Sequence, residues 1–505
     1  MNEKVCYYPP PVGGGHPPCV IIEIRTRDAQ LEIQNKSQQS TMRQVDYKNG
    51  KIFSNVMQSM LPMLVAQVLS LLYSIVDRIY IGRIPGEGTS ALGGVGLCFP
   101  IIIMVTAFTN LFGLGGAPLC SIARGQGNLR RASEVMNTAF SMLVLTGVVI
   151  TAAGELFASP LLRLFGATDG NLPHALAYLH IYLLGTIFTM LATGLNPYIN
   201  AQGFASTGMF TVVIGAVTNI LLDPLFIFVF GLGVRGAALA TILSQILSAV
   251  FVLRFLTGEK AELRLTPLKN LQELLAELAG NDPDDRFRST ALDIAGLGAS
   301  AFVMQFTNSL VSIVCNSTLS KYGGEVMISV YTIINSVRQV LETPVIAIGE
   351  GTSPVISYNY GARRPGHVRK AMLLMGCLGI GYTLIVWILI ERFPAFFISM
   401  FSTDAALMKD AIPALHLYFF AFVFQSLQYT GQTTFKALGK KKQAIFFSLF
   451  RKVVMVVPLT LLLPGVFHFG SDGVFIAEPV SNVIGGTACM VTMLSMVLPE
   501  LRKME

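Results

Sequence analysis

About twelve apolar segments, each long enough to cross a membrane, follow one another through this 505-residue chain. A helix needs roughly 20 predominantly apolar residues to span a ~30 Å hydrocarbon core. The predicted spans lie near residues 57–81, 91–118, 135–158, 176–199, 209–230, 236–256, 292–318, 326–350, 371–391, 411–433, 444–464 and 474–498. The chain is 52% hydrophobic and only 13% charged, whereas soluble domains carry about 25% charged residues. We therefore predict an all-α polytopic membrane protein that is embedded in a lipid bilayer.

Lysine and arginine are shared unequally between alternate loops. Sixteen lie in one set of loops and six in the other. Because cytoplasmic loops of membrane proteins carry the excess of basic residues, the richer set is predicted to be cytoplasmic. An even number of spans then places both termini in the cytoplasm. The formal net charge of +7 is explained by these loops, so we expect no nucleic-acid partner.

The segments outside the spans suggest a division of the chain into four parts. Residues 1–50 include the Pro- and Gly-rich stretch "YYPPPVGGGHPPC", which cannot form a helix, and we predict a disordered cytoplasmic tail. An alternative is that translation starts at Met42. Residues 51–258 form a predicted first lobe with six spans, residues 259–290 a polar cytoplasmic linker, and residues 291–505 a second lobe with six spans.

The two predicted lobes repeat each other in sequence. "GLGGAPLCSIARG" (113–125) matches "GEGTSPVISYNYG" (349–361), "GVRGAALATILS" (233–244) matches "GSDGVFIAEPVS" (470–481), and "QVLSLLYSIVD" (67–77) matches "QFTNSLVSIVC" (305–315). The offsets are 236, 237 and 238 residues. Because each lobe has an even number of spans, both insert in the same direction. This pattern predicts two six-helix lobes related by a pseudo-twofold axis along the membrane normal, with a cavity between them.

The repeat also shows where the lobes differ. Asp77 falls on Cys315, and Asp223 falls on Leu459. The first lobe would therefore hold intramembrane carboxylates at places where the second does not. A purely structural role is expected in both lobes, so this asymmetry favours a single cation site in the first lobe.

Four polar residues of the first lobe are candidates for that site. Asn219 and Asp223 are four residues apart and share one helix face. Pro224 has no N–H for the carbonyl of the preceding turn and predicts a kink beside the carboxylate, an arrangement typical of transporter ion sites. Asp77 ends a polar stripe in the first span, and Thr241 lies in a run of small residues that permits close helix approach.

The chemistry of these residues suits H⁺ or Na⁺. All four side chains offer hard oxygen atoms, and two neighbouring carboxylates in a low-dielectric medium cannot both ionise freely. One of them would then hold a proton, or both would share a small cation. The alternative interpretation is that Asp77 pairs with the adjacent Arg78, while Asp223 only fills a polar gap with hydrogen bonds.

Further polar residues within the spans are candidates to line a substrate cavity: Gln67, Ser70, Ser74, Gln305, Asn308, Ser312, Glu342 and Glu350. Glu342 lies four residues after Arg338, and we expect the two to neutralise one another. His180 and His416 lie in spans without any partner spacing and are interpreted as polar packing residues.

Several stretches resemble the multidrug and toxin extrusion (MATE) transporters of the prokaryotic type. They are Pro62 with "VDRIYIG" (76–82), "GLGGAPLCSIARGQGN" (113–128), "NAQG" (200–203), "NILLDPLFIF" (219–228) with "GVRGAALAT" (233–241), and "PVISYNYGA" (354–362). The resemblance covers about residues 51–500. It implies the MATE fold of twelve transmembrane helices in a monomer of the bacterial inner membrane. It also implies an antiporter that exports cationic or amphipathic drugs.

In one branch of this family an Asp on helix one, an Asn and an Asp four apart on helix five, and a Thr on helix six form the cation site. Asp77, Asn219, Asp223 and Thr241 match these positions. A second branch uses an acidic residue on helix seven, where this chain has Gln305, so that site is not expected. Glu350 stands where relatives often carry an amide.

We therefore expect a cation-coupled efflux antiporter without any cofactor beyond the coupling ion. The nearest rival is a lipid-linked oligosaccharide flippase of the same superfamily, which would need a cationic cavity for pyrophosphate. A membrane-embedded acyl- or glycosyltransferase would place its catalytic residues in an interfacial loop, whereas the carboxylates singled out above lie within the spans. A channel would not explain two duplicated lobes.

Overall fold

The computed structural model describes residues 3–7, 20–24, 44–85, 88–267, 272, 286–401 and 404–505. The chain divides into two compact units, Met1–Gln44 and Val45–Glu505. In the first unit, strands β1 (Glu3–Tyr7) and β2 (Val20–Ile24) pair antiparallel. The predicted tail therefore contains paired strands in its described part, because "VIIEI" is rich in residues that favour strands.

The second unit begins before the predicted boundary at residue 51. The backbone N–H of Val45 donates to the carbonyl of Gly203 at 2.8 Å. The hydroxyl of Tyr47 donates to the carbonyl of Asn200 at 3.1 Å and lies 3.2 Å from the hydroxyl of Ser59. Most of the predicted linker, residues 268–271 and 273–285, lies outside the described residues. The division into tail, lobes and linker at the predicted residues stays a prediction.

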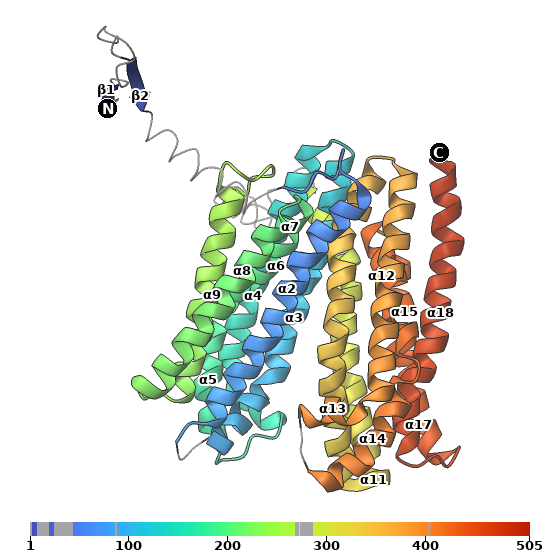
Figure 1. The fold of residues 1–505 in the computed structure, drawn as a ribbon. Coiled ribbons are helices and arrows are strands. Elements are labelled where there is room, and N and C mark those ends of the chain that lie inside the picture. The colour runs from blue at the N-terminus through green and yellow to red at the C-terminus, as the bar shows by residue number, and fades with distance from the viewer. Residues whose placement is uncertain are drawn as a thin grey trace, which may run out of the picture. The chain divides into compact units, whose positions relative to one another are not determined.

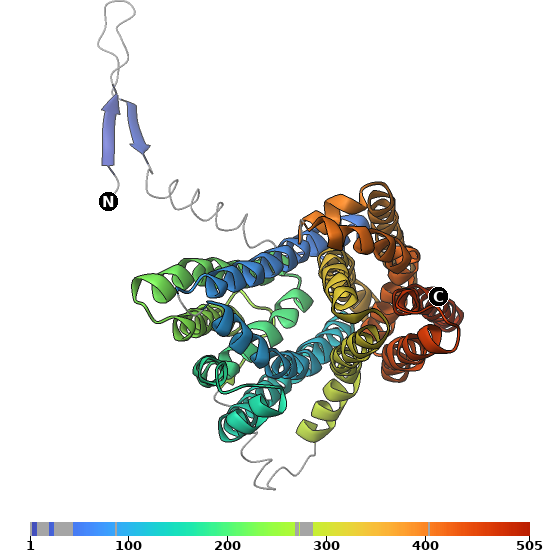
Figure 2. The same ribbon diagram turned by 90° about the horizontal axis from the view of Figure 1, so that it is seen from below.

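The second unit is helical throughout its described elements (Figure 1). The first lobe consists of α2 (Ile52–Gly82), α3 (Gly88–Gly125), α4 (Leu129–Leu164), α5 (Leu172–Leu184), α6 (Thr186–Gly194), α7 (Asn196–Ala201), α8 (Ala205–Pro224), the π-helix η1 (Leu225–Val229) and α9 (Val234–Thr257). The second lobe consists of α11 (Arg286–Gly361), α12 (Pro365–Arg392), α13 (Pro394–Ser399), α14 (Ala405–Phe419), α15 (Phe422–Ala437), α16 (Lys441–Leu449), the π-helix η2 (Phe450–Val456), α17 (Val457–Gly465) and α18 (Asp472–Lys503). Figures 1 and 2 show the helices of each lobe gathered in a bundle of their own.

The predicted spans correspond to these helices. Nine helices in the described ranges are long and apolar enough to cross a membrane, and two bent pairs, α5 with α6–α7 (56°) and α14 with α15 (44°), bring the number to eleven. Gly324, with φ 67° and ψ −164°, divides α11 into two rods. The second rod supplies the remaining predicted span, although Arg338, Glu342 and Glu350 make it less apolar. The prediction of an all-α polytopic membrane protein is confirmed.

Two His–Glu pairs show the internal repeat at atomic detail. The Nδ1 atom of His180 lies 2.5 Å from Oε2 of Glu155, and Nδ1 of His416 lies 2.7 Å from Oε2 of Glu391. Both residues of the second pair follow those of the first by 236 positions. The histidines therefore have acidic partners. Each glutamate lies 25 positions before its histidine, so no local spacing in the sequence indicates the pair.

The lobes meet where α3 and the second rod of α11 cross at their C-terminal ends. A Cβ atom added to Gly125 would lie 2.0 Å from the carbonyl oxygen of Tyr358, and one added to Gly361 would lie 2.1 Å from that of Ile122. Gly361 follows Gly125, and Tyr358 follows Ile122, by the 236 positions of the repeat, so the second contact is the counterpart of the first. Only glycine allows the backbones to approach so closely, so this symmetric crossing brings the lobes into close contact at the end predicted to be cytoplasmic.

Candidate functional site

The four residues predicted as a cation site lie together in the first lobe. Asp77 comes from α2, Asn219 and Asp223 from α8, and Thr241 from α9. The Nδ2 atom of Asn219 donates to Oδ1 of Asp223 at 3.2 Å and to Oγ1 of Thr241 at 3.5 Å. The carboxyl groups of Asp77 and Asp223 lie within electrostatic range of each other. We call these four residues the first-lobe cluster.

The first-lobe cluster contains oxygen atoms that have no donor. Oδ1 of Asp77, Oδ1 of Asn219 and Oδ2 of Asp223 are buried and accept no hydrogen bond from the described part of the chain. Asp223 is 0% exposed and Asn219 is 2% exposed. A buried carboxylate without a partner is costly, and these oxygens are the ligand type that small hard cations prefer. The cluster is therefore suited to take up a proton or a small cation.

The backbone next to the cluster changes its helical form at Pro224, where a kink was predicted. The α-helical part of α8 ends at Pro224, which cannot donate to the carbonyl of Ile220. The chain continues as the π-helix η1, in which the N–H of Phe230 donates to the carbonyl of Leu225 at 2.9 Å. Short π-helical turns inside helices are frequently found at functional sites. The predicted kink thus takes the form of a change from α- to π-helix.

Arg78 lies within electrostatic range of Asp77, but the described contacts include no ion pair between the two side chains. The guanidinium of Arg78 lies over the ring of Phe99, 4.7 Å from the ring centroid. The phenol of Tyr178 in α5 lies beside Thr241 and within electrostatic range of Asp77. Tyr178 was not among the predicted residues, because only the fold brings α5 against α9.

A cavity of about 370 Å³ lies between the lobes, within the size range of small-molecule sites. Of the predicted cavity residues, Gln67, Ser70 and Glu350 line it. The Nε2 atom of Gln67 donates to Oε2 of Glu350 at 3.1 Å, which joins α2 of the first lobe to α11 of the second. The wall also includes Lys436, which the sequence analysis counted only as a loop charge.

The other predicted cavity residues lie elsewhere. Ser74 does not line the cavity, and its hydroxyl donates to the carbonyl of Ser70 at 2.9 Å. Gln305, Asn308 and Ser312 are not part of its wall. The polar stripe of α2 nevertheless connects the cavity with the first-lobe cluster, since Gln67 and Ser70 line the cavity and Asp77 belongs to the cluster.

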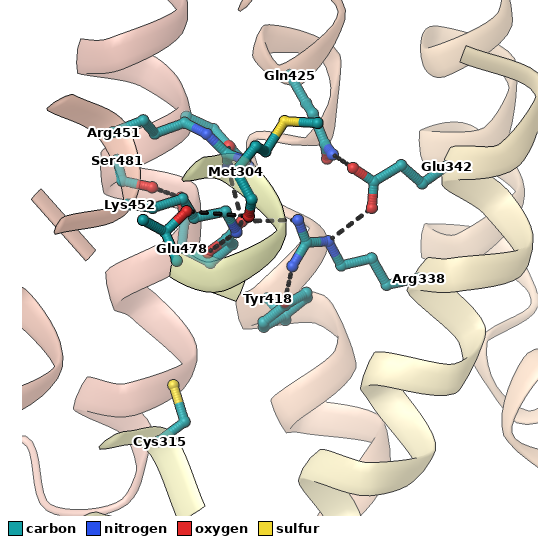
Figure 3. Close-up of polar contacts among 12 residues, drawn as sticks. Met304, Cys315, Arg338, Glu342, Tyr418, Gln425, Arg451, Lys452, Glu478 and Ser481 are labelled. Carbon is teal, nitrogen blue, oxygen red and sulfur yellow. Dashed lines mark hydrogen bonds and ion pairs between the residues drawn. The ribbon is translucent and has the colours of Figure 1, made fainter. Parts of the chain in front are cut away.

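Glu342 lies in a buried charged network of the second lobe, shown in Figure 3. We call Arg338, Glu342, Arg451, Lys452 and Glu478 the second-lobe network. The expected pairing is present, since Nε of Arg338 lies 3.2 Å from Oε2 of Glu342. The distances from Oε1 of Glu478 are 3.1 Å to Nη2 of Arg338, 2.8 Å to Nη1 of Arg451 and 3.1 Å to Nζ of Lys452.

This network adds Glu478 to the second-lobe carboxylates Glu342 and Glu350 that the sequence places within spans. Glu478 follows Thr241 by 237 positions and so occupies the repeat-related place in α18. The comparison of aspartates alone overlooked it, although the pair Arg451–Lys452 inside an apolar span was a visible signal. The lobes differ in another way: Glu478 is paired with cations of the chain itself, whereas oxygens of Asp77 and Asp223 have no partner.

Comparison with known proteins agrees with this architecture. The MatE family profile matches residues 62–225 and 300–462. The multidrug export protein MepA of Staphylococcus aureus (strain MRSA252) is 23% identical over 448 residues, which is 88% of this chain and 94% of that protein. The FAD transporter of Shewanella oneidensis is 24% identical over 446 residues, which is 87% of this chain and 93% of that protein.

Solved structures share the fold. A multidrug resistance MATE family transporter of the MOP superfamily, in an outward-facing conformation, superimposes with a TM-score of 0.82 at 23% identity, covering 91% of this chain and 99% of that one. A MOP superfamily transporter from Pyrococcus furiosus Vc1 superimposes with a TM-score of 0.81 at 22% identity and the same coverage. The family profile, the two repeated lobes and the cluster in α2, α8 and α9 together show that this chain belongs to the MATE family of multi-pass membrane transporters.

Proposed function

We propose that this transporter is a secondary active antiporter that exports cationic or amphipathic compounds in exchange for H⁺ or Na⁺. The observation that carries the coupling is the set of three buried oxygens in the first-lobe cluster that accept no hydrogen bond. The export of drugs is supported by the relatives named multidrug export proteins, while the FAD transporter shows that cargo differs among relatives. We further propose that it acts as a monomer in a bacterial inner membrane, with both termini in the cytoplasm.

The proposed mechanism follows from the arrangement of the cluster. A proton or Na⁺ that binds between Asp77 and Asp223 neutralises charge that is otherwise unpaired in a low-dielectric medium. Neutral and charged forms of the cluster favour different positions of α2 against α8. Because α2 also carries Gln67, which bonds to Glu350 in the cavity wall, a shift of α2 changes the cavity. Cation binding on one side of the membrane thereby favours release of the cargo.

The available driving force is sufficient for such an exchange. Moving one elementary charge through 100 mV provides about 2.3 kcal/mol. A tenfold concentration gradient adds about 1.4 kcal/mol per ion. One or two ions per cargo molecule therefore support export against a gradient of one to several orders of magnitude.

Reconstitution in liposomes tests this proposal. Ethidium efflux is followed under an imposed pH gradient, an imposed Na⁺ gradient, or neither, for the wild type and for Asp223→Asn. The control is Asp169→Asn, the same chemical change at an exposed first-lobe carboxylate that pairs with Arg163. We expect Asp223→Asn to lose gradient-driven efflux and Asp169→Asn to retain it.

Two results would contradict the proposal. Equal gradient-driven efflux by the wild type and Asp223→Asn would exclude the first-lobe cluster as the coupling site. Movement of a pyrophosphate-linked lipid without any dependence on either gradient would favour the flippase instead.

A further inference from the structure

The cavity between the lobes carries opposite charges on its second-lobe wall. Glu350 of α11 and Lys436 of α15 both line it and lie within electrostatic range of each other. Among the contacts of the described residues, no ion pair joins these two side chains, and the ammonium of Lys436 donates no hydrogen bond. Glu350 has one oxygen, Oε2, bonded to Gln67. A half-buried ammonium without an acceptor is costly, so this wall offers a charge that a ligand can satisfy.

The first-lobe wall of the cavity offers polar atoms without partners. Oδ1 of Asn200 and Oγ of Ser121 are buried and form no hydrogen bond within the described part of the molecule. Both residues line the cavity. The amide of Asn200 is held in place by its Nδ2 atom, which donates to Oδ1 of Asn196 at 3.2 Å. These unpartnered atoms are the second indication that a polar ligand binds there.

The first lobe has no charged residue at the repeat-related counterparts of Glu350 and Lys436. Lys436 follows Asn200 by 236 positions, and Glu350 follows Leu114 by the same number. All four residues line the cavity. The two lobes thus present the same helical positions to the cavity, with an amide and an apolar side chain on one side and an ammonium and a carboxylate on the other.

We propose that the cavity binds a zwitterionic amphipathic molecule. Its cationic group lies against Glu350, its carboxylate lies against Lys436, and its polar edge meets Asn200 and Ser121 of the opposite wall. A purely cationic ligand would leave the ammonium of Lys436 buried beside a like charge. The assignment of this cavity as the cargo site rests on the proposed function, whereas the charge selectivity of binding does not.

Two dyes with the same ring system test this selectivity. Rhodamine 110 carries a xanthylium cation and a free carboxylate, and rhodamine 123 is its methyl ester and therefore only a cation. Binding to the purified protein is measured by fluorescence polarisation. Because a charge-assisted hydrogen bond to Lys436 is available only to the free carboxylate, we expect rhodamine 110 to bind about tenfold more tightly.

Three variants assign the selectivity to the two charges. Lys436→Met should remove the preference and leave the affinity for rhodamine 123 unchanged or higher. Lys436→Arg keeps the charge and should restore most of the preference, which separates a charge effect from a packing effect. Glu350→Gln should weaken the binding of both dyes, because both carry the cationic ring.

The outcomes separate this inference from the proposed function. Equal or tighter binding of the ester, an unchanged preference in Lys436→Met, or no binding of either dye would each overturn the inference. If the predicted selectivity is found but no gradient drives export, the binding site stands and the antiport proposal fails. If ethidium is exported by a gradient while the ester is preferred, antiport stands and the zwitterion site fails.

Discussion

Replacing Gly125 by alanine tests how the two lobes are held together at the crossing of α3 and α11. The added Cβ atom would lie 2.0 Å from the carbonyl oxygen of Tyr358. A Cβ atom essentially never lies closer than 3.0 Å to a heavy atom outside its own residue and its chain neighbours. Because the obstacle is backbone on both sides, no side-chain rotation relieves the clash, and the helices have to separate by about 1 Å.

The size of the effect follows from this overlap. Overpacking of a tightly packed contact costs about 1–3 kcal/mol, and each 1.4 kcal/mol changes an equilibrium about tenfold. The equilibrium between crossed and separated lobes should therefore move about 5- to 150-fold toward separation. Spin labels introduced by Arg130→Cys in α4 and Lys370→Cys in α12, both at exposed positions, report this change as a longer distance between the labels in a cysteine-free background.

A second glycine provides the matched control. Gly381 lies within α12, and a Cβ atom added there meets nothing within 4 Å. Gly381→Ala should leave the label distance unchanged. If Gly125→Ala also leaves it unchanged, or if both substitutions lengthen it equally, the glycine crossing does not hold the lobes together and the reasoning is refuted.

Three further substitutions address other parts of the structure. Arg338→Leu leaves Glu342 buried without its guanidinium partner. The solubilised protein should therefore lose about 3–5 kcal/mol of unfolding free energy, which is measured as a lower midpoint of thermal unfolding. An unchanged midpoint would show that the second-lobe network does not stabilise the fold. Pro224→Ala supplies the missing N–H and favours α- over π-helix. Gradient-driven efflux should therefore fall, while circular dichroism should show an intact helical fold. Full efflux would argue against a role for η1. Gly116→Ala places a Cβ atom 1.8 Å from the hydroxyl of Tyr198, which donates to the carbonyl of Phe112 at 2.8 Å. The free energy of unfolding should therefore fall by about 1–3 kcal/mol. A larger loss in Tyr198→Phe than in Gly116→Ala would contradict this steric explanation.

The spans and the first-lobe cluster were accessible from sequence for simple physical reasons. Hydropathy along the chain identifies membrane helices, because each span must be apolar over its own length. Asn219 and Asp223 share a helix face through the period of the α-helix alone. The partners Asp77 and Thr241 lie on other helices, and the resemblance to the MATE family was needed to place them beside Asp223.

The cavity could not be predicted with the same success. The stripe of Gln305, Asn308 and Ser312 has the spacing of one helix face, but spacing does not say whether that face points to the cavity, to lipid or to a neighbouring helix. Glu342 likewise joins a network whose other members come from η2 and α18. The His–Glu pairs, by contrast, were encoded in the 236-residue repeat and would have been found by comparing every polar residue with its counterpart.

If the proposed antiport holds, the distribution of paired and unpaired charges favours the first lobe as the one that responds to the coupling ion. In the second lobe, Glu478 is already surrounded by two guanidiniums and an ammonium of the chain, so its charge needs no incoming cation. In the first lobe, Asp77 and Asp223 retain buried oxygens without donors, and a proton or Na⁺ changes their interaction directly. Movement should therefore begin in α2 and α8. Because Gln67 of α2 bonds to Glu350, that movement reaches the carboxylate on the cavity wall against which the cationic group of the cargo is proposed to bind.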